Sequence, residues 1–358
     1  MTVMPALVVG LALQLLVGAF AFLLPDRTRP DLFFAVTVDP GIRGRLEGRT
    51  IVARYRRETA IVIALAVVLL AGVVRAGEPW GLAAGLFVEL AGLSATYYRA
   101  HRRTLPFAAA STTVRESALE PGTAVLPAAW VQAGPFALLA GLAWYLQAHW
   151  NLIPEQFPVH WNLAGQPDRW ASRSVSGVYG GLIVSGAVCL LMLGLSWGIA
   201  RWTRPINVSG PAAVSERRFK RAMLRLLLAA EYVVSGIFAV VSWSSVHSTR
   251  AIPVWWLLTA PLAFVATTML VLLRMGQGGS RLAGAVSGAG AIVGDRTDDR
   301  HWKAGVFYVN GDDPALFVEK RFGGGYTINM AHPGAWLILG AIVAVVVLVP
   351  WLARAYHR

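Results

Sequence analysis

Residues 177–200 read GVYGGLIVSGAVCLLMLGLSWGIA and hold no Asp, Glu, Lys or Arg. A helix of about 20 apolar residues spans the hydrocarbon core of a bilayer, so this run has the length that a membrane crossing requires. It lacks the polar stripe that a helix on the surface of a soluble protein shows. The stretch therefore predicts a transmembrane helix.

Seven further apolar blocks occur along the chain, at 4–24, 59–76, 80–98, 129–149, 223–246, 252–273 and 334–353. Of the 358 residues, 56% are hydrophobic and only 14% are charged, whereas an ordinary soluble protein has roughly 25% charged residues. The sequence thus predicts an all-α polytopic protein of a bacterial cell membrane, with about eight transmembrane helices.

The basic residues lie in bursts between these blocks rather than in one stripe. Segments 25–58, 99–128, 201–225 and 274–333 carry 26 of the 32 Lys and Arg residues. The positive-inside rule places such segments in the cytoplasm, so we expect both termini and segment 150–176 outside. Because no basic stripe with interleaved aromatic residues exists, we expect no nucleic-acid partner.

The blocks and loops divide the chain into six expected parts. In the fifth part, Leu316–Arg321 and Tyr326–Met330 are predicted to be strands of a β-hairpin, because a glycine-rich turn joins them. The parts are an N-terminal four-helix membrane region (1–149), an extracellular loop module (150–176), a three-helix membrane region (177–273), a Gly-rich linker (274–300), a cytoplasmic β-hairpin module (301–333), and the last transmembrane helix with its tail (334–358).

Two acidic side chains, Glu89 and Glu231, interrupt the apolar blocks. A charged group in the middle of a bilayer costs roughly 2.5–3.5 kcal/mol, so both are expected to face the interior of the helix bundle. Glu89 shares a helical face with glycines, and Glu231 shares one with Ser235 and Ser242. Two interpretations stay open: a proton or cation site, or glutamates that fix helix packing.

The external loop contains an extended motif at 153–170, Ile-Pro-x-x-x-Pro-Val-His-Trp-Asn-x-x-Gly-x-Pro-Asp-Arg-Trp. This motif resembles the domain of unknown function DUF1648, which also occurs in the immunity protein for the sporulation-delaying peptide toxin. The resemblance implies a related role here, with the matching positions as candidate ligand-binding or loop-shaping residues. They are Pro158, His160, Asn162, Gly165, Pro167 and Asp168.

The segment before the last block resembles a second family, DUF5808. The two modules often occur together in bacterial membrane proteins of this size, which strengthens the expected family membership. The matching positions are His301, Trp302, Tyr308, Asp313, Pro314, Phe317, Val318, Gly325 and Asn329.

Three interpretations of the external motif stay open. His160, Asp168 and Glu155 could respond to pH or bind a metal ion, although their spacing matches no standard metal motif. Alternatively, the polar residues shape turns while the aromatic residues lie at the membrane interface. In the third interpretation, the loop contacts a ligand or peptide directly.

No motif of a zinc protease, a serine hydrolase or a phosphate-binding loop occurs, so we expect no enzyme activity, cofactor or metal site. The leading hypothesis is a membrane protein that senses, or gives immunity to, a membrane-active peptide through segment 150–176. Its expected partners are the lipid bilayer, an extracellular peptide and a cytoplasmic regulator. The alternative is a secondary transporter that uses Glu89 and Glu231. A third possibility is a purely structural role.

Overall fold

The computed structural model describes residues 4–76, 81–109, 126–161, 166–203, 210–244, 246–247, 254–283 and 297–348. In this part of the chain, six helices are long and apolar enough to cross a membrane. They are α1 (Met4–Leu23), α2 (Leu46–Arg75), α4 (Ala129–Ala148), α5 (Val175–Trp202), α6 (Gly210–Ser244) and α7 (Val254–Met275). The prediction of a multi-pass helical membrane protein is confirmed to this extent.

The two other expected spans are also helical but are not among these six. Block 80–98 lies in α3 (Gly81–Thr104). Glu89 and the basic residues in the last turn lower the mean hydropathy of this helix. Block 334–353 forms α9 (Pro333–Val343) and a π-helical turn at Ala344–Leu348. Its remaining residues lie outside the described part. The predicted number of about eight spans is therefore not confirmed.

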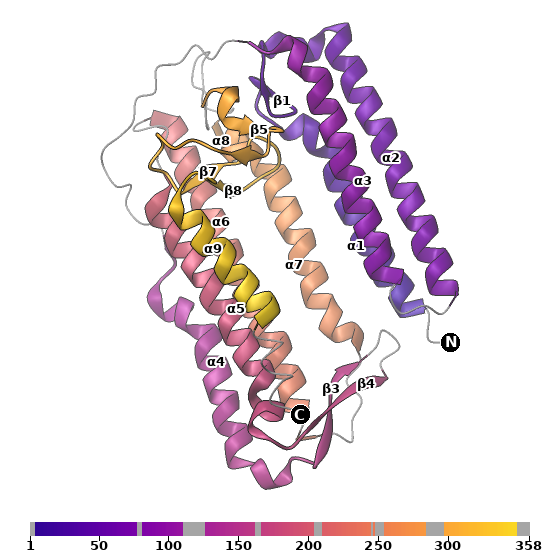
Figure 1. Ribbon diagram of the computed structural model, residues 1–358, viewed down its shortest axis with the longest axis vertical. Helices are drawn as coiled ribbons and strands as arrows, with labels where there is room; N and C mark the ends of the chain where they lie inside the picture. Colours follow the sequence, from indigo (N-terminus) through magenta and orange to yellow (C-terminus); the bar gives the residue numbers. More distant parts are fainter. Residues whose placement is uncertain are drawn as a thin grey trace.

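The long helices form two bundles of three (Figure 1). The N-terminal bundle contains α1, α2 and α3, and the C-terminal bundle contains α4, α5 and α6. Helix α7 lies between the bundles and contacts α1 and α6. The sequence groups α4 with the first three helices, but α4 packs on α5 and α6. Residues 105–128 separate it from α3, so chain order does not force these two helices to be neighbours.

Glycines allow close approach in both bundles. A Cβ atom on Gly85 of α3 would lie 2.7 Å from Nε2 of Gln14 in α1. A Cβ atom on Gly134 of α4 would lie 1.9 Å from the hydroxyl oxygen of Tyr232 in α6. Small residues thus bring helices together in the way that membrane bundles commonly use.

The four basic segments meet at one end of the helices, which we call the basic end. The contacts are a β-bridge between Val38 and Ala108, hydrogen bonds from Thr37 to Asp299, and a β-bridge between Thr203 and Phe317. Each of the segments 25–58, 99–128, 201–225 and 274–333 therefore contacts another member of the set. For the described parts of these segments, the predicted placement on one common side of the helices is confirmed.

Four separate β-hairpins complete the described structure. At the basic end lie β1 (Leu32–Phe33) with β2 (Val36–Thr37), β5 (Trp302–Lys303) with β6 (Phe307–Tyr308), and β7 (Phe317–Glu319) with β8 (Tyr326–Ile328). The fourth hairpin, β3 (Gln156–Trp161) with β4 (Pro167–Ser172), lies at the opposite end (Figure 1).

The β7–β8 hairpin confirms the strands expected at 316–330, with Phe317 opposite Ile328 and Glu319 opposite Tyr326. The sequence missed the other three hairpins. Two of them have strands of only two residues, too short for a periodic signal, and β3 contains Pro158, which argues against a strand. In the expected linker 274–300, residues 277–283 form a 3₁₀ turn and the short helix α8 (Ser280–Ala283).

Candidate functional site

The β3–β4 hairpin is anchored on the C-terminal bundle by an apolar cluster. Ile153 is 1% exposed and Phe157 is 2% exposed. They pack with Leu146 at the end of α4 and Val178 at the start of α5. Since two successive strands of a free hairpin are marginally stable in water, this packing explains why the loop holds a fixed form. Pro158, two residues before the candidate His160, and Trp161, directly after it, are also buried.

His160 and Asp168 pair across the hairpin on its solvent side. His160 Nδ1 lies 2.5 Å from Asp168 Oδ1, and the two side chains are 54% and 42% exposed. Among the described residues, no three His, Cys, Asp or Glu side chains gather closely enough to hold a metal ion, so Glu155 does not complete a cluster with this pair. The candidate residues Asn162 and Gly165 lie outside the described part of the chain.

The outer edge of β4 is the most exposed feature of this hairpin. Pro167, Asp168, Arg169 and Trp170 are all exposed, and Trp170 is 56% exposed. β4 pairs with β3 on one side, and no strand within the described ranges pairs with its other side. An unpaired strand edge presents backbone N–H and C=O groups to which an extended chain can bind.

At the basic end, the candidate residues of the second module form a buried hydrogen-bond network rather than an open site. The Nδ2 atom of Asn329 donates to the carbonyl oxygens of Asn310 and Asp313, at 2.8 and 3.1 Å. The hydroxyl of Tyr308 donates to Asp313 Oδ2 at 2.8 Å and accepts a hydrogen bond from Asn310. A buried polar network in which each member has partners fixes one local structure. Their role here is to shape the loop between β6 and β7.

The other candidates of this module lie around the network. The indole N–H of Trp302 donates to Thr297 Oγ1, while His301 is half-buried and Pro314 is exposed. Gly325 has a φ of +94°, a conformation that an L side chain rarely adopts, at the end of the turn between β7 and β8. We therefore interpret the candidates of the second module as structural.

The sequence missed Arg321, which joins this module to the first basic segment. Its side chain is 1% exposed, and its guanidinium group forms an ion pair with Asp299. It also donates to the carbonyl oxygens of Thr297 and Ala35, and it lies 5.2 Å from the centre of the Trp302 ring. A buried charge requires such partners, yet no sequence motif marks an isolated Arg as buried.

Arg43 organises the first basic segment in the same way. Its guanidinium group donates to the carbonyl oxygens of Pro25, Arg29 and Leu32, at 2.9, 2.8 and 2.7 Å. Burial lowers the pKa of Arg43, and the nearby carboxylates of Asp26 and Asp31 partly offset this effect. The segment that the sequence describes only as basic is thus a folded element around one arginine.

Two strained turns meet at the end of α3. Phe34 and Ala35, at the turn between β1 and β2, have φ values of +45° and +65°, and Ala304 has +52°. Non-glycine residues with positive φ are costly and persist only where contacts hold them. Here His101 Nδ1 lies 2.8 Å from the carbonyl oxygen of Phe34, and the Tyr97 hydroxyl donates to the carbonyl oxygen of Ala304 at 3.2 Å. The end of α3 therefore holds both hairpins in place.

Glu89 and Glu231 lie in different bundles. Glu89 is fully buried in α3, beside Gly18 of α1, and neither of its carboxylate oxygens has a hydrogen-bond partner among the described residues. Glu231 is 1% exposed in α6 and shares its buried face with Ser235 and Ser242. The predicted burial of both side chains is confirmed.

Comparison with known families covers both modules. Residues 137–180, from the middle of α4 through the β3–β4 hairpin into α5, match the domain of unknown function DUF1648. Residues 312–336 match a family of unknown function, DUF5808. The chain carries both domains. No curated protein and no solved structure matches it.

These matches agree with the resemblances drawn from the two motifs. The DUF1648 hairpin (153–172) and the DUF5808 module (297–333, which extends the matched segment to include β5 and β6) lie at opposite ends of the C-terminal bundle (Figure 1). They are connected by α5. Ser174, two residues after β4, caps the start of this helix by accepting a hydrogen bond from Gly177 N–H. At the other end, Leu316 N–H donates to the carbonyl oxygen of Trp202.

Proposed function

We propose that this protein is a bacterial membrane receptor that binds an extracellular, membrane-active peptide on its DUF1648 hairpin, and so senses the peptide or protects the cell from it. The observation that carries this proposal is the exposed outer edge of β4 on a hairpin that is otherwise fixed by buried side chains. A rigid hairpin with an open edge suits recognition, since little order must be gained when a partner binds.

The proposal includes a topology with eight spans. Helix α3 packs along α1 and α2 and would cross the membrane with them, and α9 would form the last crossing. Under the positive-inside rule, the excess of Lys and Arg in the four segments of the basic end supports a cytoplasmic position for this end. Both termini and the DUF1648 hairpin would then be extracellular.

The binding mode that fits β4 is strand addition. An extended peptide adds to an open sheet edge through backbone hydrogen bonds, and neighbouring side chains give selectivity. Trp170 would supply an apolar contact, as tryptophan commonly does at a membrane interface. The His160–Asp168 pair would supply a polar contact at the tip of the hairpin.

A signal would pass through α5. This helix begins three residues after β4 and ends at Trp202, beside the DUF5808 module. At this end Gly198 lies so close to the module that a Cβ atom on it would be 2.8 Å from the Phe317 ring. One rigid helix thus contacts both domains. A displacement at the hairpin would therefore move the Trp202 end of α5, which lies against the DUF5808 module. The partner of the DUF5808 module would be a cytoplasmic regulator.

A survival assay tests this proposal. A sensitive bacterium that expresses the protein is challenged with a panel of membrane-active peptides, and membrane abundance is measured in parallel. We expect the wild type to protect and Trp170→Ala to lose protection at equal abundance. Leu152→Ala is the matched control, because Leu152 is also exposed (64%) and adjoins the hairpin but lies outside β4. Equal protection by Trp170→Ala and the wild type would refute binding at the β4 edge.

The second candidate function is secondary transport, which the burial of Glu89 and Glu231 favours. Buried intramembrane carboxylates often mark proton or ion pathways. In vesicles, a transporter would show solute uptake that Glu89→Gln and Glu231→Gln each abolish. A receptor would keep protection in both variants and show no uptake, so the two assays together separate the candidates.

A further inference from the structure

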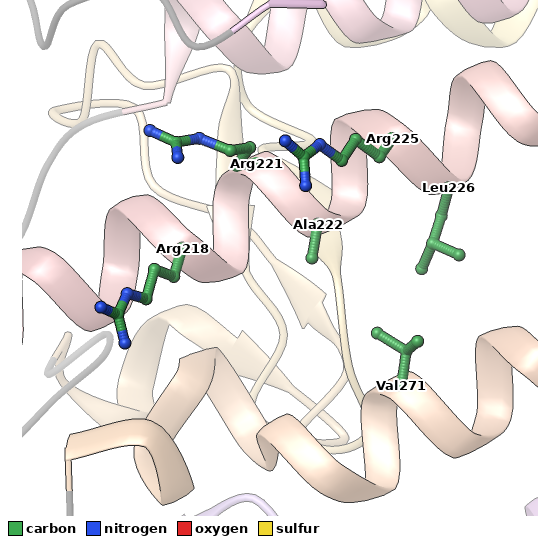
Figure 2. Close-up of a pocket in the computed structure, with 6 residues that line it drawn as sticks. All are labelled: Arg218, Arg221, Ala222, Arg225, Leu226 and Val271. Atoms are coloured by element: carbon green, nitrogen blue, oxygen red, sulfur yellow. The ribbon is translucent and has the colours of Figure 1, made fainter.

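A groove runs between α6 and α7 near the basic end (Figure 2). It has a volume of about 390 Å³. Apolar side chains from the two helices face one another across it, and arginines line its α6 side. The lining residues are Arg218, Arg221, Ala222, Arg225, Leu226 and Val271.

The three arginines provide a concentrated positive charge. Arg218, Arg221 and Arg225 are separated by three and four positions, so they lie along neighbouring turns of α6, and all are exposed. Among the residues that the structure describes, none of the three forms an ion pair within 4.0 Å. A single anion between these side chains would be held by charge-assisted hydrogen bonds, and guanidinium groups match phosphate oxygens especially well.

The groove lies where α6 changes from basic to apolar. Between Arg225 and the end of the helix at Ser244, no Lys or Arg occurs. Leu226 and Val271 therefore continue the groove toward the apolar stretch of both helices. A site of this form suits a molecule with an anionic head and a hydrocarbon tail.

Helix α7 has apolar side chains that the rest of the protein does not fully cover. In its most apolar stretch no residue is buried inside the protein. It contacts α1 on one side and α6 on the other, between the two bundles. A lipid tail along Val271 would cover part of this surface.

We propose that this groove binds an anionic phospholipid, with its phosphate between Arg218, Arg221 and Arg225 and one acyl chain along Leu226 and Val271. Basic pockets between transmembrane helices are known to hold anionic lipid headgroups. The bound lipid links α7 to the C-terminal bundle. This site is separate from the DUF1648 hairpin and does not depend on peptide binding.

Native mass spectrometry of the full-length protein tests the proposal. The protein is equilibrated with equal amounts of phosphatidylglycerol and phosphatidylcholine, and the ratio of retained lipids is measured. We expect the wild type to prefer phosphatidylglycerol and the triple variant Arg218→Gln, Arg221→Gln, Arg225→Gln to lose this preference by roughly tenfold or more, given three basic groups near one phosphate.

The matched control removes three arginines from the start of α2. Arg49, Arg54 and Arg57 are exposed and also precede an apolar stretch. The control variant Arg49→Gln, Arg54→Gln, Arg57→Gln has the same net charge as the first one and should keep the preference. If both triple variants lose it equally, surface charge alone attracts the lipid and the proposal is wrong.

Two further measurements test whether the ligand of the groove is a lipid: one uses the variant Ala222→Leu, and the other uses competition with glycerol phosphate. Ala222→Leu narrows the groove without changing any charge, and it should lower phosphatidylglycerol retention even if the triple variant does not fold. Glycerol phosphate, which has the head chemistry without the chains, should not displace the lipid. Full displacement by glycerol phosphate, or unchanged retention in Ala222→Leu, would overturn the assignment to a lipid.

Discussion

The N-terminal and C-terminal bundles have the same number of helices but differ in the domains attached to them. Each contains three helices, and each has one buried glutamate on its third helix, Glu89 or Glu231. The bundles run in opposite directions, because α1 ends at the basic end whereas α4 ends at the DUF1648 hairpin. Both matched domains are attached to the C-terminal bundle, and α1, α2 and α3 lie outside both matches.

This difference suggests a division of roles. The C-terminal bundle connects the DUF1648 hairpin to the DUF5808 module through α5. The N-terminal bundle holds the DUF5808 module in place through Tyr97, His101 and the β1–β2 turn. Changes in the N-terminal bundle are therefore expected to affect stability. Changes at the ends of the C-terminal bundle are expected to affect recognition.

The largest effect on stability is expected at the basic end, where Arg321 joins the DUF5808 module to the β1–β2 turn. Arg321→Ala leaves Asp299 and two carbonyl oxygens without their buried partner, and removal of one member of a buried ion pair costs about 3–5 kcal/mol. Thermal unfolding in detergent should show a large drop, with faster hydrogen exchange in residues 297–333. Arg45→Ala is the control: its ion pair with Asp39 is exposed, at 58% and 56%, and contributes at most about 1 kcal/mol. Equal losses in the two variants would contradict the assigned role of Arg321.

A medium effect on stability is expected from substitution of the glycines at the helix contacts, and it should be larger in the N-terminal bundle than in the C-terminal bundle. In Gly85→Ala the new methyl group meets the fully buried Gln14 side chain, with Leu70 behind it, so we expect a loss of about 1–3 kcal/mol. In Gly134→Ala the new methyl group meets the hydroxyl end of Tyr232, a side chain that is 40% exposed and can turn away. The second loss should be below about 1 kcal/mol, because only the hydrogen bond from Tyr232 to the Val131 carbonyl oxygen is broken. Urea or heat titration of both variants measures the difference, and the reverse order would contradict the packing described.

A smaller effect is expected at the start of α5. Ser174→Ala removes the oxygen that caps Gly177 N–H and should cost about 1 kcal/mol. Ser174→Asp restores a capping group and should recover most of the loss. If Ser174→Ala is as stable as the wild type, the cap does not contribute to joining α5 to the hairpin.

The smallest stability effect is expected at the His160–Asp168 pair. Both side chains are about half exposed, so Asp168→Asn should change the free energy of unfolding by less than about 1 kcal/mol. Under the proposed function, the same variant loses protection against the peptide. A large loss of stability would instead assign Asp168 to the fold of the hairpin.

The features predicted from the sequence are those with a long or periodic signal. Apolar blocks gave the helices, the distribution of Lys and Arg gave the common side of four segments, and the glycine-rich turn gave β7–β8. Buried faces around Glu89 and Glu231 followed from the helical period. The DUF1648 and DUF5808 motifs were recognised from a few closely spaced residues.

The missed features depend on contacts between distant segments. Arg321 meets Thr297, Asp299 and Ala35 only after the chain has folded. The turn at Phe34–Ala35 has positive φ but contains no glycine or asparagine that would predict it. The turn is stabilised instead by His101 of α3, a contact between distant segments that the sequence does not reveal. The groove between α6 and α7 likewise forms only where these two helices pack together, and no sequence motif marks the residues that line it.

The measurement that tests the central claim most directly is the accessibility of single cysteines in intact cells. Cys189 is buried and is the chain's one cysteine, so Cys189→Ala gives a clean background. In that background, Arg169→Cys in β4 and Lys303→Cys in the DUF5808 module each replace an exposed residue at opposite ends of the C-terminal bundle. With a reagent that does not cross membranes, we predict labelling of Arg169→Cys in intact cells and of Lys303→Cys only after permeabilisation. Labelling of both in intact cells, or the reverse pattern, would contradict a receptor with its hairpin outside and its second module inside.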